Sequence, residues 1–280
     1  MIRRWYVPLT TMALLLGSWL AAGSASAAPL SAGPGAELPA AAAAAGTGFT
    51  PGGRLIGPAN QARPTAPGAV NAEVGSTNWS GYAATGANGA FSRVSASWTE
   101  PTATCSSGGR RSAQYAAFWV GLDGYASNSV EQTGTDSDCV GRTPDYYGWY
   151  EMYPANPVYF SNTVRPGDAL SASVTFSGTE TYTLVLRDST EGWTQTITQN
   201  EAGLARSSAE VITEAPSSGA GVLPLANFGT VSYASAAANG TALASLSPTE
   251  IIMVDSSGLD KDSTSAITGG AFSNTWLRST

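Results

Sequence analysis

The chain contains no histidine in its 280 residues. Histidine is the general base of Ser–His–Asp and Cys–His catalysis and the commonest nitrogen ligand of zinc. Its absence excludes both kinds of nucleophilic catalysis and the histidine-based zinc sites. Any reaction that this protein carries out must therefore use carboxylates, amides and hydroxyls.

Charge is also scarce, because Asp, Glu, Lys and Arg together make up 12% of the chain. From residue 74 onward, eighteen acidic residues stand against nine basic ones, and Lys261 is the single lysine of the sequence. This acidic balance argues against nucleic acids and anionic membranes as partners. In strong acid the carboxylates are neutralised and few cations remain, so charge repulsion within the domain stays small. The composition therefore suits an acidic medium.

Cysteine occurs twice, as Cys105 and Cys139. In a secreted chain, two cysteines most simply form one disulfide bond, here between the loop before the strand Tyr115–Leu122 and the loop after Gln132. A reactive thiol without a histidine partner is the alternative. Closing about 35 residues would add roughly 3–4 kcal/mol to the free energy of unfolding in the loop-entropy model.

The N-terminus has the pattern of a secretory signal peptide. Arg3 and Arg4 precede a leucine-rich apolar run that ends at the small residues Ala25–Ser–Ala27. The run is shorter than the roughly 20 residues of a membrane span. We therefore predict a signal peptide over residues 1–27 and a secreted, extracellular protein without membrane contact once the signal is removed.

A composition change near residue 74 indicates a domain boundary. Residues 28–73 are rich in Ala, Gly and Pro, include the run Ala40–Ala45, and show neither a strand period nor a sustained helical one. We interpret them as a prosegment or low-complexity leader. Residues 74–280 are long enough for one domain with a substantial core.

The domain is predicted to be all-β. Phe91–Trp98 and Leu170–Phe176 alternate apolar with polar residues, and Tyr115–Leu122 is a continuous apolar run typical of a strand buried on both faces. No stretch after residue 74 sustains the spacing of an amphipathic helix. Further strands are expected at Val130–Thr135, Tyr146–Tyr153, Tyr182–Leu186, Trp193–Gln199, Ala209–Glu214, near Val231, Glu250–Val254 and Ala271–Trp276. Short strands with Gly-rich turns favour a β-sandwich or jelly roll.

Three glutamates lie among aromatic or β-branched neighbours. Glu151 belongs to Trp149–Pro154, and Glu210 and Glu214 belong to Ala209–Glu214. A half-buried carboxyl group loses hydration and shifts its pKa, and such groups cluster at functional sites. The structural alternative is a carboxylate held by turn amides or an arginine, with no reaction to perform.

The residues alone leave several functions open. A groove across a β-sandwich suits an extended polymer, either a saccharide or a peptide. Glu151 and Glu214 facing each other would make a retaining glycoside hydrolase. A carbohydrate-binding module without any reaction is a further possibility.

Four motifs follow one another along the chain: Trp119–Val–Gly–Leu–Asp–Gly124, Gln132–Thr–Gly134, Trp149–Tyr–Glu–Met–Tyr–Pro154 and Ala209–Glu–Val–Ile–Thr–Glu214. In order and spacing they resemble the glutamic peptidases of the eqolisin family. The resemblance extends from Asn78–Trp79 to the C-terminal strand. It implies an acid endopeptidase folded as a jelly-roll-like, concanavalin-like β-sandwich of two curved antiparallel sheets.

The resemblance also implies the site. It makes Gln132 and Glu214 the catalytic pair, whereas Glu210 and Glu131, which is on the opposite face of the strand from Gln132, are interpreted as structural. The chain departs from the family pattern at Tyr147, where an Asp can stand four residues before the Glu of the aromatic strand. The cleft residues that would bind substrate are Trp79, Trp119, Asp123, Trp149 and Glu151.

This pair can hydrolyse an amide without histidine. Ionised Glu214 would take a proton from a water that attacks the peptide carbonyl, and the Gln132 amide would donate to the developing oxyanion. Because Gln132 is neutral, it does not raise the pKa of Glu214 by repulsion, so Glu214 is expected to stay ionised in acid. We expect a monomer that acts on polypeptides, uses no cofactor or metal, and loses its leader, which covers the cleft until acidification.

Overall fold

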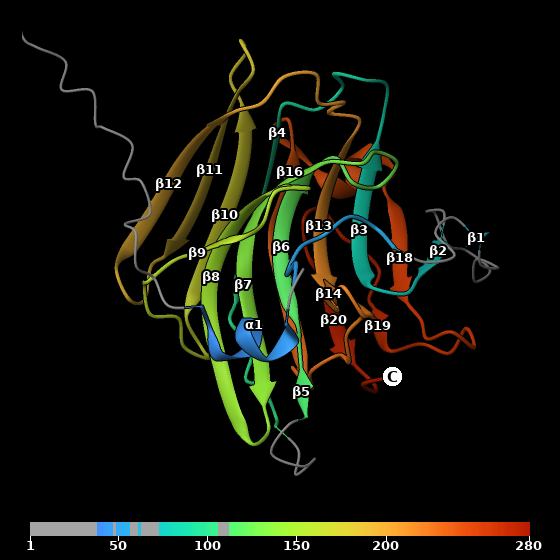
Figure 1. The fold of residues 1–280 in the computed structure, drawn as a ribbon. Helices are drawn as coiled ribbons and strands as arrows, with labels where there is room; N and C mark the ends of the chain where they lie inside the picture. The colour runs from blue at the N-terminus through green and yellow to red at the C-terminus, as the bar shows by residue number, and fades with distance from the viewer. Residues whose placement is uncertain (1–37, 47–48, 57–60, 63–72, 106–111) are drawn as a thin grey trace, which may run out of the picture.

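The computed structural model describes residues 38–46, 49–56, 61–62, 73–105 and 112–280. Within these residues, β-strands dominate and form two large sheets that pack face to face (Figure 1). A separate hairpin consists of β14 (Ser217–Ser218) and β15 (Gly221–Val222). The architecture confirms the all-β sandwich that the alternating patterns predict.

The larger sheet has ten strands and carries the four motifs of the sequence on β6, β7, β8 and β13 in its centre. Its order is β1-β2-β18-β3-β13-β6-β7-β8-β9, with β5 paired to β7, and every pairing except β18 with β2 is antiparallel. The strands are β1 (Gln61–Ala62), β2 (Glu73–Ser76), β3 (Trp79–Thr85), β5 (Ala113–Gln114), β6 (Ala117–Leu122), β7 (Val130–Val140), β8 (Thr143–Tyr153), β9 (Val158–Tyr159), β13 (Ser208–Glu214) and β18 (Thr249–Met253).

The smaller sheet has eight strands in the order β12-β11-β10-β4-β16-β20-β19, with β17 paired to β16. They are β4 (Arg93–Thr99), β10 (Ala169–Phe176), β11 (Thr181–Asp188), β12 (Trp193–Asn200), β16 (Thr230–Ala238), β17 (Thr241–Ala242), β19 (Asp262–Thr264) and β20 (Phe272–Trp276). Two short helices complete the described elements, α1 (Ala40–Ala45) and the 3₁₀ helix η1 (Leu243–Leu246).

The main core lies between the two sheets, and period-two alternation explains how it forms. On β4, Val94, Ala96 and Trp98 are buried and belong to this core, while Arg93 and Thr99 are exposed. β6 differs because all six of its residues are buried. Its even-numbered residues face the main core, and its odd-numbered residues face a second apolar cluster on the outer side of the larger sheet. The prediction of a strand buried on both faces is confirmed.

The predicted disulfide bond is present between Cys105 and Cys139. The predicted setting of Cys139 was wrong, because β7 continues to Val140 and so includes it, rather than ending in a loop after Thr135. The polar run Asp136–Asp138 has the composition of a turn, but its side chains are buried and hydrogen-bonded within the strand. The disulfide therefore joins the loop before β5 to the end of a long central strand.

The leader contains more regular structure than its composition indicates. The alanines of residues 40–45 form α1, which agrees with the high helix propensity of alanine. Ala41 donates its backbone N–H to Asp145 Oδ2 at 2.9 Å, which ties α1 to β8. The predicted signal peptide lies outside the described residues. Among the described residues, no helix is long and apolar enough to cross a bilayer.

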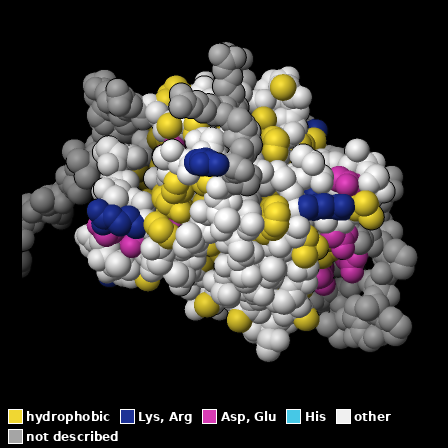
Figure 2. Space-filling view, turned by 90° about the horizontal axis from the view of Figure 1, so that it is seen from below, with side chains coloured by type: hydrophobic (Ala, Val, Ile, Leu, Met, Phe, Trp, Pro, Cys, Tyr) yellow, Lys and Arg dark blue, Asp and Glu magenta, His cyan; other side chains and the backbone are white. Residues whose placement is uncertain are grey.

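Charged side chains occupy only a few places on the face of the molecule seen in Figure 2, and most of that face is uncharged. Many acidic groups are instead buried, and Glu100 is an example between the two sheets. It accepts hydrogen bonds from Thr135 Oγ1 at 2.5 Å and Ser137 Oγ at 2.6 Å, both on β7. Burial raises the pKa of Glu100 to about 8, although these hydroxyl bonds lower it.

We predict that Glu100 makes the fold more stable in acid than at neutral pH. A carboxyl whose pKa is higher in the folded state contributes to the free energy of unfolding, and this contribution is complete below the unfolded pKa of 4.5. It is lost as the pH rises through the folded pKa of about 8. At ~1.4 kcal/mol per pKa unit, the loss is on the order of 4 kcal/mol. Glu100→Gln should remove this part of the pH dependence, measured by urea unfolding at both pH values. Glu201→Gln, at an exposed position, is the control, and equal pH dependence in the two variants would contradict the prediction.

Candidate active site

Gln132 and Glu214 project from the same face of the larger sheet, although two strand pairings separate them. Residues directly opposite each other in paired strands share a face, and side chains return to that face every second residue. Glu214 on β13 is opposite Ala117 on β6, and Ala117 is opposite Asp136 on β7. Gln132 stands four residues before Asp136 and therefore lies on this face too, which we call the cleft face.

Two donors hold the carboxyl group of Glu214. Asn78 Nδ2 donates to Oε1 at 3.2 Å and Trp119 Nε1 donates to Oε2 at 2.9 Å. Trp79 is directly opposite Glu214 on β3, and its ring meets the Trp119 ring edge-on with 4.9 Å between centroids. Two of the three tryptophans predicted to line the cleft thus lie beside Glu214, and one of them, Trp119, contacts it directly.

Glu151 fixes the side-chain amide of Gln132. The two residues are directly opposite on β7 and β8, and Gln132 Nε2 donates to Glu151 Oε2 at 2.6 Å. Burial raises the pKa of Glu151 to about 8, whereas the bond from Gln132 lowers it. In acid the Glu151 carboxyl is therefore neutral and adds no negative charge beside Gln132. Gln132 Oε1 is buried and has no hydrogen-bond partner in the described part of the chain.

Trp149 lines the cleft next to Gln132 and is anchored from behind by an acidic pair. Trp149 Nε1 donates to Asp136 Oδ1 at 2.6 Å. The Tyr147 hydroxyl lies 3.1 Å from Asp136 Oδ2 and 2.7 Å from Asp138 Oδ2, so it is within hydrogen-bond distance of both carboxyls. Burial, and then repulsion between neighbouring carboxylates, raises the pKa of Asp136 well above its ordinary range. Tyr147 thus occupies the position where the family pattern can have an Asp. The two carboxyl groups near its hydroxyl, Asp136 and Asp138, both lie on β7.

The glycine of the Gln132–Thr–Gly134 motif is required by close packing. Gly134 is opposite Trp119 on one side and Trp149 on the other. A Cβ atom there would lie 2.1 Å from the Phe118 carbonyl oxygen and 2.6 Å from Trp119 Cβ. A larger residue would therefore displace Trp119, which holds Glu214.

Asp123 lies beyond the end of β6, away from these contacts. Its carboxylate accepts from the backbone N–H of Arg206 at 2.6 Å and of Ser207 at 2.9 Å. Its hydrogen bonds within the described residues thus go to the segment leading into β13. This placement indicates that Asp123 holds the segment before β13 in position. The other predicted cleft residues lie closer to the pair: Trp119 and Glu151 bond to Glu214 and Gln132, and Trp79 and Trp149 are one neighbour away.

The leader segment 49–56 lies on the cleft face, where Figure 1 shows it in blue in front of the larger sheet. The segment is hydrogen-bonded to β14, since the Thr50 N–H donates to Ser217 O at 3.0 Å. A Cβ atom on Gly52 would lie 2.3 Å from Trp149 Cη2 and 2.7 Å from Gln132 Oε1. The backbone of Gly52 is therefore packed against the side chain of Gln132.

Asn78 bonds to this leader segment as well as to Glu214. Its Nδ2 donates to Arg54 O at 3.2 Å, and its Oδ1 accepts from the Ile56 N–H at 2.7 Å. Phe49 and Leu55 are buried in the apolar cluster of the cleft face. A stretch of this chain thus lies on the cleft face, with its backbone hydrogen-bonded to a residue that holds Glu214.

Burial under this segment changes the charge of Glu214. Burial raises its pKa well above the ordinary range, the negative charge of Glu151 adds to the rise, and the bonds from Asn78 and Trp119 lower it. In the covered state the carboxyl is therefore neutral in acid. A neutral partner at Gln132 is therefore not enough to keep Glu214 ionised, because loss of hydration on burial raises the pKa of Glu214 more than the hydrogen bonds lower it.

Two residues of the site were missed by sequence reasoning. In the sequence, Asn78 is noticed only as the start of the family resemblance, yet it is fully buried and holds Glu214. Asp136 was assigned to a loop. Its spacing of four from Gln132 would have placed it on the cleft face if the strand had been extended past Thr135. Among the described residues, no cluster of three or more Cys, Asp or Glu is arranged to hold a metal ion.

Comparison with known proteins supports a single class. Residues 77–275 match the model of the Peptidase A4 family. Aspergillopepsin-2 of Aspergillus niger is 30% identical over 191 residues, a match that covers 61% of this chain and 67% of that protein. Among solved structures, scytalido-glutamic peptidase with a transition state analog inhibitor superposes with a TM-score of 0.61 at 27% identity, covering 72% of this chain and 98% of that one. SCP-B, an eqolisin peptidase in complex with the tripeptide Ala-Ile-His, gives a TM-score of 0.58 at 25% identity with the same coverage.

Proposed function

Because the chain belongs to the Peptidase A4 family of glutamic endopeptidases, we propose that it is secreted and hydrolyses peptide bonds in acid with Gln132 and Glu214 as its catalytic pair. The observation that carries this proposal is the seating of residues 49–56. A stretch of ordinary peptide backbone fits along the cleft face, with Gly52 against Gln132 and with Asn78 bonded to the backbone of Arg54 and Ile56. Substrate chains are polypeptides that follow a similar path.

Hydrolysis uses one carboxylate twice. Ionised Glu214 removes a proton from a water molecule as the water oxygen attacks the peptide carbonyl carbon. The Gln132 amide donates a hydrogen bond to the carbonyl oxygen as negative charge develops there. The C–N bond then breaks, and protonated Glu214 delivers its proton to the leaving nitrogen, which returns the carboxyl group to its ionised state.

The surrounding residues orient this pair. Trp119 and Asn78 donate to Glu214 and favour its ionised form, which a general base needs in acid. Glu151 orients the side-chain amide of Gln132 by accepting its hydrogen bond. Asp136 holds the indole of Trp149, which forms a wall of the cleft. No step requires a metal, a cofactor or a second protein subunit, and we propose that the enzyme acts as a monomer.

The test is proteolysis of a denatured protein over an acidic-to-neutral pH series, with and without an aspartic-peptidase inhibitor. Cleavage in acid that persists with the inhibitor supports the proposal. Absence of cleavage, or cleavage that the inhibitor abolishes, would contradict it. A saccharide polymer incubated in parallel tests the glycoside hydrolase alternative.

We further propose that the leader is an inhibitory prosegment. It fills the cleft, and its contacts with Gln132 and Asn78 compete with those of a substrate. Gly52→Val should disturb this seating, because the new Cβ would overlap Trp149 and Gln132. In a progress curve of peptide hydrolysis in acid, the full chain should show a lag that the variant shortens or loses.

The matched control for this prediction is Ala44→Val, which adds side-chain carbons at an exposed position of α1 in the same leader. It should keep the lag of the wild-type chain. An unchanged lag in Gly52→Val would show that seating at Gln132 does not limit activity.

A further inference from the structure

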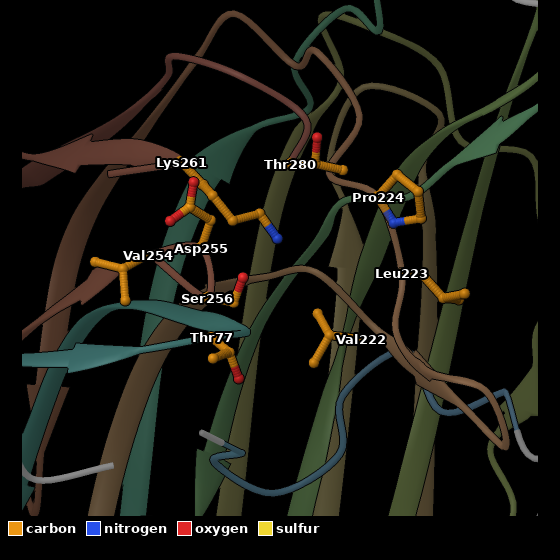
Figure 3. Close-up of a pocket in the computed structure, with 9 residues that line it drawn as sticks. All are labelled: Thr77, Val222, Leu223, Pro224, Val254, Asp255, Ser256, Lys261 and Thr280. Atoms are coloured by element: carbon orange, nitrogen blue, oxygen red, sulfur yellow. The ribbon is translucent and has the colours of Figure 1, made fainter. Parts of the chain in front are cut away.

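A cavity of about 580 Å³ lies beside the cleft face, and it is lined by apolar and polar side chains in similar shares (Figure 3). One side of it is formed by the chain that follows β15, and the opposite side by the turn after β18. Val222, Leu223 and Val254 belong to the apolar part of the lining, and the polar part includes Asp255, Lys261 and Thr280.

Lys261 is the single lysine of the chain, and its side chain is 4% exposed. Figure 3 shows its ammonium nitrogen pointing into the cavity. In the described part of the chain, this ammonium makes no hydrogen bond and no ion pair. Asp255 also lines the cavity, but it accepts from Ser257 and from the Leu259 N–H and forms an ion pair with Arg278, whose Nη2 lies 3.4 Å from Asp255 Oδ2. Asp262 Oδ2 accepts from Ser80 Oγ.

The charge of Lys261 persists through the acidic range. Burial lowers its pKa to about 8, and the negative charges of Asp262 and Asp255 oppose this effect. Below that pH the cavity contains a cation that has lost most of its hydration. Burying a cation without a partner is costly, so an anion that enters the cavity gains a strong interaction.

The cavity opens next to the path that the leader takes through the cleft. Thr77 directly precedes Asn78, which holds Glu214, and the Thr77 N–H donates to Ile56 O at 3.1 Å. On the other rim, the hairpin that leads to Val222 begins at Ser217, which pairs with Thr50. A peptide bound along residues 50–56 therefore passes between the two rims, and Figure 3 shows this segment in blue below Val222 and Thr77.

We propose that this cavity is a specificity subsite that receives a carboxylate of the bound peptide and pairs it with Lys261. The inference rests on the proposed peptidase function and adds a substrate preference to it. The carboxylate comes either from an Asp or Glu side chain or from the C-terminus of the substrate. The apolar wall of Val222, Leu223 and Val254 contacts the methylene groups or the neighbouring side chain of that residue.

The expected preference is large enough to measure. A hydrogen bond between charged groups contributes about as much as a tenfold to hundredfold change in an equilibrium constant. We therefore expect a substrate with the carboxylate at the right position to be cleaved with a kcat/KM roughly ten times that of its amide twin, or more. The difference should be seen near pH 5, where a substrate glutamate is ionised and Lys261 is protonated.

The experiment uses the full chain after incubation in acid and a set of peptides with one cleavage site. A single Glu is moved through the positions on both sides of the scissile bond, and each peptide has a Gln twin. Every peptide is made with a free and with an amidated C-terminus. A Glu preference at one position assigns the side-chain source, and a preference for the free terminus assigns the terminal source.

Lys261→Met keeps most of the side-chain volume and should abolish the preference while the amide twins are cleaved as before. Arg187→Met removes one positive charge from an exposed position on β11 and should leave the preference intact. If the wild-type enzyme cleaves every Glu peptide as fast as its Gln twin, and free termini as fast as amidated ones, the subsite proposal is wrong. This result does not depend on whether the Lys261→Met variant folds. A failure to cleave any peptide would instead overturn the peptidase function on which the subsite depends.

Discussion

Glu214→Gln is expected to reduce peptide hydrolysis to the background rate while the protein remains folded. The substitution removes the group that, in the proposed mechanism, takes the proton from water and delivers it to the leaving nitrogen. It preserves the shape of the side chain, and the new carbonyl oxygen can still accept from Trp119 Nε1. Because burial keeps the Glu214 carboxyl neutral under the leader, the neutral amide is well tolerated by the folded chain.

Glu210→Gln is the matched control for this experiment. Glu210 lies four residues earlier on the same strand, faces the same side of the sheet and is equally buried. Its pKa is also raised by burial, so the two substitutions have similar effects on charge. Activity should be lost in Glu214→Gln and retained in Glu210→Gln, with thermal unfolding confirming that both are folded. If the Glu214→Gln and Glu210→Gln variants hydrolyse the peptide at equal rates, Glu214 is not a catalytic residue.

Gln132→Ala is expected to lower kcat by ~10²–10³-fold, the usual effect of losing an oxyanion donor. KM should change less, because the interaction strengthens only as the carbonyl oxygen gains charge. Steady-state kinetics on one peptide in acid measure both constants. Gln199→Ala, on β12 of the other sheet, should leave both near their wild-type values.

Gln132→Glu extends this prediction to pH. A carboxyl at position 132 would face Glu151 and approach Glu214, so its titration would couple to theirs. Residual activity should then require one of these groups to be protonated, and the pH–rate profile should shift. A wild-type rate and profile in this variant would show that position 132 does not contact the reacting carbonyl.

The sheet faces could be predicted from the sequence because alternation determines them. The pattern of β4 gave the correct core residues, and the apolar run of β6 indicated burial on both faces. The strand register could not be derived in this way. Gln132 and Glu214 share a face of the sheet because β6 lies between their strands, with Ala117 opposite Glu214 and Gly121 opposite Gln132. That pairing depends on contacts distant in sequence, so the catalytic pair came from the family resemblance.

The polar part of β7 shows a second limit. Thr135 to Asp138 resembles a turn because its residues are polar, but Glu100, Trp149 and Tyr147 satisfy their hydrogen-bonding groups from other strands. Local composition does not reveal such partners. The seating of residues 49–56 was hidden for the same reason, since their backbone bonds to Asn78 and Ser217 require the folded cleft.

The most direct test of the assigned pair compares kcat/KM for Gln132→Ala and Glu151→Gln on one peptide in acid. The two residues are hydrogen-bonded to each other, so both variants disturb the same place in the cleft. Because Glu151 acts through its hydrogen bond with Gln132, and a glutamine oxygen can still accept that bond, Glu151→Gln should cost much less than removing the Gln132 amide. The account predicts a loss of ~10²–10³-fold for Gln132→Ala and a clearly smaller loss for Glu151→Gln. The reverse order would contradict it and would assign catalysis to a pair of carboxyls, Glu151 and Glu214.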